Sequence, residues 1–248
     1  MAWEFDARKA ARGGDLSETG AGSYGRAGAI AGTAAGFMAG VYRWMTLGLA
    51  VTAGVALYTA SNVPLATMVA RNIWLVFGAQ FVLVLALTFM AQRLTGPVAA
   101  LMFMVYAGAM GLTMSGIFFI YPLGSIGVTF LVTAGAFAAL SLYGTVTKRD
   151  LGAWGTFLFM GLVGVVIASI VSIWWHNPAF NFALTCAVVV VFAGLTAYDT
   201  QKLRMLGAQF AGTGLTSVTI LGALNLYLDF INLFIALLRL FGGGRQRE

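Results

Sequence analysis

Long apolar runs separated by short polar connections make up nearly all of the chain after residue 40. We place seven of these runs, at residues 44–60, 73–91, 98–120, 123–143, 151–174, 180–198 and 218–240. Each approaches or exceeds the roughly 20 residues that a helix needs to cross a hydrocarbon layer about 30 Å thick. The pattern predicts an all-α membrane protein with seven transmembrane helices, in which short connections make successive helices antiparallel neighbours.

Composition supports the same class of protein. The chain is 60% hydrophobic and only 9% charged, with a mean hydropathy of +0.90, whereas about a quarter of the residues in soluble domains are charged. Its net charge of +6 comes from basic residues scattered singly or in pairs, so we expect no nucleic-acid partner. We divide the chain into a flexible cytoplasmic arm at 1–40, a seven-helix domain at 41–242 and a short polar tail at 243–248.

Lys and Arg fall mainly on the side of the predicted bundle that carries the N-terminus. Because cytoplasmic loops are enriched in these residues, we expect a multi-pass protein with a cytoplasmic N-terminus. The side of the C-terminal tail is open. The length of the seventh run favours a complete span, which would place the tail outside, whereas the charge bias favours a tail inside.

Two carboxylates stand within or at the edge of the predicted spans, Asp199 and Asp229. An ionisable group at bilayer depth is costly and marks a functional site by default. Asn225 and Asn232 are four residues before and three residues after Asp229, so helical spacing puts all three on one face. The rest of that helix is apolar on nearly every side, which predicts a central position in the bundle.

Two facing carboxylates in an apolar interior cannot both ionise easily, so the pair is expected to share a proton near neutral pH. Loss of that proton would add like-charge repulsion and loosen the helix contact. Two carboxylates are too few for the six to eight oxygen ligands of tight calcium binding. Asp199 and Asp229 would therefore bind calcium only weakly and transiently, and we expect no other metal there. These acids meet only if the sixth span runs deeper or the seventh begins nearer Leu221. The alternative is that Asp229 and the asparagines only hydrogen-bond between helices.

Two motifs stand out around the acids, AYDTQK at 197–202 and ALNLYLDFINLFIALLRLFG at 223–242. Together they resemble the Bax inhibitor-1 family of membrane proteins, and VYRWMTLGLAVTAGVA at 41–56 resembles the first span of that family. The resemblance implies a seven-helix fold whose last helix is surrounded by the others. It also implies a pH-regulated calcium leak in a bacterial cytoplasmic membrane, controlled by two aspartates that correspond to Asp199 and Asp229. Calcium would be the permeant ion, and no cofactor is expected.

Some members of that family carry an acid in the second span and arginines just after it. Gln80 and, nearby, Arg93 occupy the corresponding positions here, so the acid is absent. We expect the aspartates to be supported by Tyr198, Asn225, Tyr227, Asn232, Gln80 and Arg93.

Two other functions compete with the leak. An intramembrane aspartyl protease would resemble presenilin-like enzymes and carry GxGD in the later span, whereas this chain has NLYLD there and no proline after Pro178. We therefore expect no enzyme activity. Bacterial members of the Bax inhibitor-1 family are associated with membrane proteases as substrates or modulators. An interaction role, with the N-terminal arm as the handle for such a protease complex, is the main alternative. The expected partners are otherwise the lipid bilayer, calcium and protons.

Overall fold

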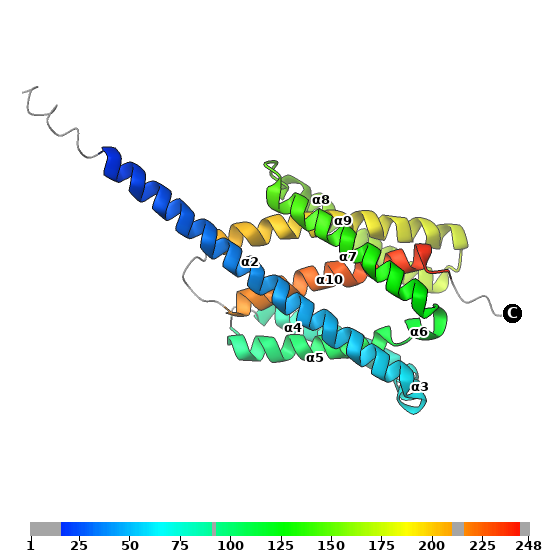
Figure 1. Ribbon diagram of the computed structural model, residues 1–248. Coiled ribbons are helices and arrows are strands. Elements are labelled where there is room, and N and C mark those ends of the chain that lie inside the picture. Colours follow the sequence, from blue (N-terminus) through cyan, green and yellow to red (C-terminus); the bar gives the residue numbers. More distant parts are fainter. Residues whose placement is uncertain (1–15, 91–92, 210–215, 244–248) are drawn as a thin grey trace, which may run out of the picture.

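The computed structural model describes residues 16–90, 93–209 and 216–243, with side chains from Ala34 onward. Within those ranges every regular element is a helix (Figure 1). In chain order the helices are α2 (Leu16–Ser61), α3 (Val63–Arg71), α4 (Ile73–Met90), α5 (Gly96–Met114), α6 (Ile117–Ile120), α7 (Leu123–Val146), α8 (Gly152–Trp174), α9 (Pro178–Gln209) and α10 (Thr216–Phe241).

The seven predicted spans are confirmed. Seven stretches of helix in the described residues are long and apolar enough to cross a membrane. They are Ala34–Ser61 in α2, α4, Gly96–Ile120 through α5 and α6, α7, α8, α9 and α10.

The structure differs from the predicted runs in three places. Helix α2 begins at Leu16, so residues 16–40, expected as a flexible arm, are helical, and Met38 lies in the hydrophobic core. Helix α9 continues to Gln209, past the apolar run that ends at residue 198. A helix between the first two spans, α3, was not predicted. It begins after Asn62, whose side chain accepts a hydrogen bond from the Leu65 amide, as N-cap residues do. Residues 1–15 and 244–248, which belong to the arm and the tail, lie outside the described residues.

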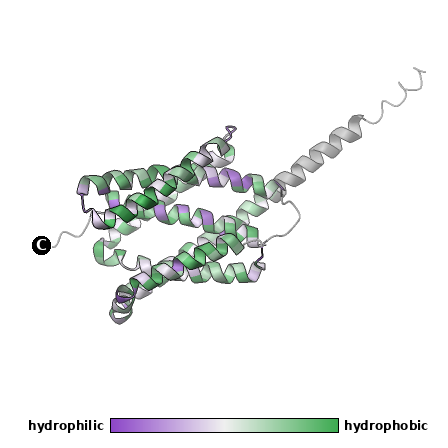
Figure 2. Ribbon diagram, turned by 180° about the vertical axis from the view of Figure 1, so that it is seen from behind, coloured by the Kyte–Doolittle hydropathy of each residue, from purple (hydrophilic) through white to green (hydrophobic). Residues whose placement is uncertain are grey.

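Helix α10 is the centre of the bundle, as predicted. It contacts α2, α5, α7 and α9, and both views show it running between the other helices (Figures 1 and 2). In the most apolar stretch of α10, 72% of the residues are buried, against 11% to 33% in the corresponding stretches of the other six spans. A helix that is apolar nearly all round buries the most surface when other helices enclose it. The central position of α10 therefore follows from its sequence.

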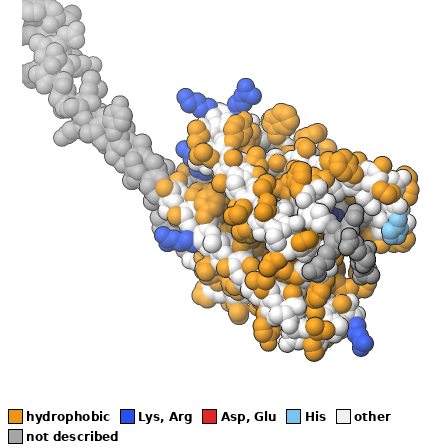
Figure 3. All heavy atoms as spheres, turned by 45° about the vertical axis from the view of Figure 1, so that its right-hand side comes forward, with side chains coloured by type: hydrophobic (Ala, Val, Ile, Leu, Met, Phe, Trp, Pro, Cys, Tyr) orange, Lys and Arg blue, Asp and Glu red, His pale blue; other side chains and the backbone are white. Residues whose placement is uncertain are grey.

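The outer helices present large apolar side chains to their surroundings. Trp74 and Phe89 on α4 are 74% and 79% exposed, and Figure 3 shows apolar side chains over most of the visible face. Most of the Lys and Arg side chains visible in that figure lie at one end of the bundle. Apolar patches of this extent on a soluble monomer would cause association, whereas hydrocarbon solvates them well.

Small residues allow the helices to approach closely at two crossings. A Cβ added at Gly111 of α5 would lie 2.7 Å from the Thr52 carbonyl oxygen of α2. A Cβ added at Gly144 of α7 would collide with the backbone of Ala197 of α9. Close backbone contact through small residues is the usual mode of helix association in membranes.

The contact at Gly144 predicts a difference between two glycines of the same helix. Gly144→Ala must push α7 away from the backbone of α9, which costs on the order of 1–3 kcal/mol, as overpacking does. Gly135→Ala is the matched control, since nothing lies within 4 Å of a Cβ added there. We expect Gly144→Ala to lower the unfolding temperature in detergent and Gly135→Ala to leave it unchanged or raised. Equal unfolding temperatures would contradict the α7–α9 packing.

Candidate functional site

Asp229 is buried in the middle of the central helix. Its side chain is only 4% exposed, and its Oδ2 atom has no hydrogen-bond partner among the described residues. Most buried polar atoms in proteins are hydrogen-bonded, so a buried carboxylate oxygen without a donor requires an explanation. The second acid predicted for the site, Asp199, lies on the neighbouring helix α9.

The lengths of α9 and α10 bring Asp199 and Asp229 to nearly the same depth. Asp199 lies about ten residues, or about 15 Å, before the end of α9 at Gln209. Asp229 lies about thirteen residues, or about 20 Å, after the start of α10 at Thr216. The two helices are consecutive and packed against each other, so these distances are measured from the same end of the bundle. The sixth span does run deeper, which is one of the two conditions under which the acids could meet.

The two acids also occupy the faces through which α9 and α10 touch. Gly222 of α10, seven residues before Asp229, packs against Leu203 of α9, four residues after Asp199. Leu233, four residues after Asp229, belongs to the same buried cluster as Leu195, four residues before Asp199. Side chains at these spacings share a helix face. Asp199 and Asp229 are therefore bracketed by two pairs of facing residues, and we call this contact the α9–α10 seam.

Charges at the seam act on one another. Asp199 and Asp229 are close enough to interact electrostatically, and Lys202 acts on Asp199 in the same way. Lys202 is exposed one turn beyond Asp199, with its Nζ atom 5.8 Å from the centre of the Tyr198 ring. The seam thus has a buried acid, a half-buried acid and an exposed cation in order along its length. Two facing carboxylates of this kind can hold a proton between them or attract a divalent cation.

The two asparagines predicted to support Asp229 lie on its helix, but neither is hydrogen-bonded to it in the part of the chain that the structure describes. Asn232 is half-buried, and its Nδ2 atom donates to the Leu228 carbonyl 2.8 Å away. Asn225 is also half-buried. Both keep the polar stripe of α10 at its less enclosed side, and neither is a donor to the Asp229 carboxylate.

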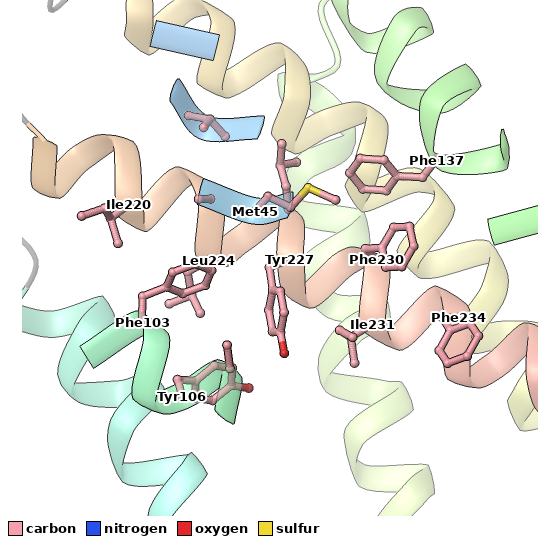
Figure 4. Packing of buried hydrophobic residues seen from close by; sticks show 14 of the residues in the cluster. Met45, Phe103, Tyr106, Phe137, Ile220, Leu224, Tyr227, Phe230, Ile231 and Phe234 are labelled. Atoms are coloured by element: carbon pink, nitrogen blue, oxygen red, sulfur yellow. The ribbon is translucent and has the colours of Figure 1, made fainter. Parts of the chain in front are cut away.

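Tyr227 faces away from the seam. It lies two residues before Asp229, and side chains two apart on a helix do not face the same way. Its ring is fully buried and packs edge-to-face against Phe103 and Tyr106 of α5, with centroids 5.6 and 6.0 Å apart (Figure 4). Tyr227 therefore joins α10 to α5 rather than supporting the carboxylates.

The Tyr227 hydroxyl is hydrogen-bonded to Thr52 of α2, with the oxygens 2.6 Å apart. Thr52 Oγ1 is also 2.9 Å from the carbonyl oxygens of Gly48 and Ala107. Carbonyl oxygens only accept hydrogen bonds, so the Thr52 hydroxyl donates its single proton to one of them. The Tyr227 hydroxyl must therefore donate to Thr52 Oγ1. These hydrogen bonds link α10 to α2. Thr52 is one of many threonines in the spans, so the sequence gave no signal of its role.

Of the other predicted supporting residues, Gln80 and Arg93 lie away from the seam, whereas Tyr198 stands beside it. Gln80 is buried between α4 and α5, where its Nε2 atom donates to the Ala109 carbonyl at 2.7 Å and to Thr113. Arg93 is exposed in the turn before α5. Tyr198 packs against Gly155 of α8. In the described parts of the chain no group of three or more His, Cys, Asp or Glu could hold a metal ion.

Comparison with known proteins places this architecture in a family. The family model described as "Inhibitor of apoptosis-promoting Bax1" matches residues 34–247. The chain belongs to the Bax inhibitor-1 family. It is 49% identical to the inner membrane protein YbhL of Escherichia coli K12 over 84% of this chain and 92% of that protein. It is 43% identical to an uncharacterized protein of Deinococcus radiodurans, over 86% of this chain and 91% of that one. The resemblance predicted from the sequence motifs is confirmed, and the chain is a multi-pass membrane protein of this family.

The donor assignment at Thr52 predicts unequal effects for two substitutions. Thr52→Val leaves the buried Tyr227 hydroxyl without an acceptor, which costs about 1–3 kcal/mol. Tyr227→Phe removes the donor and leaves only acceptors, so it should cost about 1 kcal/mol or less. Unfolding free energies in mixed detergent micelles should rank wild type, Tyr227→Phe and Thr52→Val in falling order. The double variant should be destabilised by less than the sum of the two, and additivity would contradict the hydrogen bond.

Proposed function

We propose that this protein is a pH-sensitive cation leak, with calcium as the permeant ion, gated by Asp199 and Asp229. The observation that supports the proposal is the facing arrangement of these two acids across the α9–α10 seam. The central helix contributes one acid and a peripheral helix the other. A change in their charge therefore acts on the contact between the middle of the bundle and its outer layer.

The gate works by like-charge repulsion. With one proton on the pair, the two carboxyl groups carry a single negative charge between them and the seam stays closed. When that proton leaves, the two carboxylates repel each other. For scale, unit charges 4 Å apart repel by about 4 kcal/mol at an effective dielectric constant near 20. That energy is comparable with the packing energy of a few side chains, so it is enough to open the seam. The leak should accordingly increase as pH rises.

Calcium fits the pair as a passing ion. A tight calcium site needs six to eight oxygen ligands, and two carboxylates supply only part of that number. An ion held by Asp199 and Asp229 would keep much of its water and leave readily, as permeation requires. Asn225 and Asn232, half-buried on the same helix as Asp229, offer further polar contacts along the route.

We place the protein in a bacterial cytoplasmic membrane with its N-terminus in the cytoplasm. The relative from Escherichia coli is named as an inner membrane protein. Lys148, Arg149, Lys202 and Arg204 all stand at the end of the bundle where α7 and α9 finish. Basic residues of this kind mark the cytoplasmic side.

An interaction role is the second candidate. Helix α2 is 46 residues long, about 69 Å, and its first part projects well beyond the bundle (Figure 1). A projecting helix is a suitable handle for a membrane protease or another membrane partner. This role is compatible with a leak, since the projecting part lies away from the α9–α10 seam.

The gate predicts how calcium flux depends on pH. In proteoliposomes containing the wild-type protein, calcium entry should rise from pH 6 to pH 8, by at most about tenfold per pH unit for a single proton. Asp199→Asn and Asp229→Asn each remove one of the two charges that repel, so both variants should lose this pH dependence. A fluorescent calcium indicator inside the vesicles measures the rate.

Asp150→Asn is the matched control, because it makes the same chemical change at an exposed loop position. It should keep the pH dependence of the wild type. Flux that responds to pH identically in wild type and both seam variants would eliminate the gate. Absence of flux in all of them, with binding to a membrane protease intact, would favour the interaction role.

A further inference from the structure

A large cavity opens at the end of the bundle that carries most of the basic residues. Its volume is about 1080 Å³, and it lies between α2, the connection from α7 to α8, and the last turns of α9. The α7 span ends at Val146 and the α8 span begins at Gly152. The cavity therefore lies at the level where helices leave the hydrocarbon and lipid headgroups begin.

Two unlike walls line this cavity. Lys148, Arg149 and Arg204 stand on one side, and all three side chains are exposed. The α2 side is apolar and consists of Ala34, Ala35, Met38, Ala39 and Tyr42. Among the lining residues that the structure describes, the only acid is Asp150, whose Oδ1 atom accepts a hydrogen bond from the Gly152 amide, 2.8 Å away. The cavity thus has an excess of positive charge facing a hydrocarbon-like wall.

The cationic wall is held in place by a buried side chain. Gln201 of α9 is 9% exposed, and its Oε1 atom accepts from the Leu151 amide at 2.8 Å. Its Nε2 atom donates to the Arg149 carbonyl at 2.9 Å. The Arg204 guanidinium donates to the Thr145 carbonyl at the end of α7. These bonds fasten the α7–α8 connection to α9, so the cations are positioned before any ligand arrives.

We propose that this cavity binds an anionic phospholipid of the adjoining leaflet. The phosphate would sit against Lys148, Arg149 and Arg204, and an acyl chain would lie along the apolar wall of α2. Basic pockets between transmembrane helices are suited to anionic headgroups. A free phosphate ion would occupy only a small part of the volume and would leave the apolar wall wet, which is why a lipid fits better. The proposal is independent of the leak, because neither Asp199 nor Asp229 lines the cavity.

The proposal is tested by counting lipids bound to the full-length protein with native mass spectrometry. Dioleoylphosphatidylglycerol and dioleoylphosphatidylcholine, which have the same chains, are titrated separately into detergent-purified protein. We expect one site at which the anionic lipid binds at least about tenfold more tightly, given the contribution of each basic residue near a membrane surface. The triple variant Lys148→Gln/Arg149→Gln/Arg204→Gln should lose that preference.

Two further variants test whether the position and the sign of the charges in the cavity determine binding. Arg71→Gln/Arg239→Gln removes cations outside the cavity and should bind like the wild type. Ala35→Glu leaves the cations in place but sets an acid on the exposed apolar wall, so it should weaken binding of the anionic lipid by a similar factor. Equal binding of the two lipids, or an unchanged preference in the triple variant, would overturn the proposal. Displacement of the lipid by an equal concentration of glycerol 1-phosphate would also overturn it, since it would show a site for a free phosphate group.

Discussion

The carboxylate of Asp229, buried in a helix that is otherwise apolar, is the constraint on which the rest of the bundle depends. A charged group at this depth is tolerated only where it faces the interior and has a partner or access to water. Helix α10 meets that condition by standing at the centre, and α9 meets it by extending far enough to set Asp199 opposite. A shorter α9 would leave Asp229 facing hydrocarbon side chains alone.

The two sides of α10 are built for different purposes. On one side Tyr227 is fixed by two aromatic rings and by the hydrogen bond to Thr52, which fasten α10 to α5 and α2. On the other side the α9–α10 seam is bracketed by apolar contacts but contains two carboxyl groups. A change of protonation at the seam would therefore separate α10 from α9, while the contacts of α10 with α5 and α2 would stay in place. The proposed lipid site lies farther along α9, where Gln201 ties that helix to the α7–α8 connection.

Hydropathy alone predicted the seven spans and the central position of the last helix, because the bilayer thickness strongly constrains sequence. It also singled out the two acids as candidate site residues, because a charge buried in an apolar run is costly. It did not predict that α9 reaches Gln209, because the apolar run stops at residue 198 and the stretch after Asp199 is polar. That stretch is helical because Leu203 packs against Gly222, and Gly207 packs against Phe37 of α2. Tyr227 was predicted to support the acids, but its ring packs against α5 and its hydroxyl bonds to α2. Its true partner, Thr52, is distant in the chain, and only the packing of three helices reveals it.

The most direct test of this account is disulfide crosslinking across the seam. In a Cys186→Ser background, Asp199→Cys and Asp229→Cys are combined, and the protein in native membranes is oxidised. Facing cysteines close enough for a disulfide should crosslink readily, as detected by cleavage between α9 and α10 followed by electrophoresis. The pair Asp199→Cys with Tyr227→Cys, whose second member faces α5, should not. Crosslinking of the Tyr227 pair in place of the Asp229 pair would contradict the facing arrangement from which the proposed gate follows.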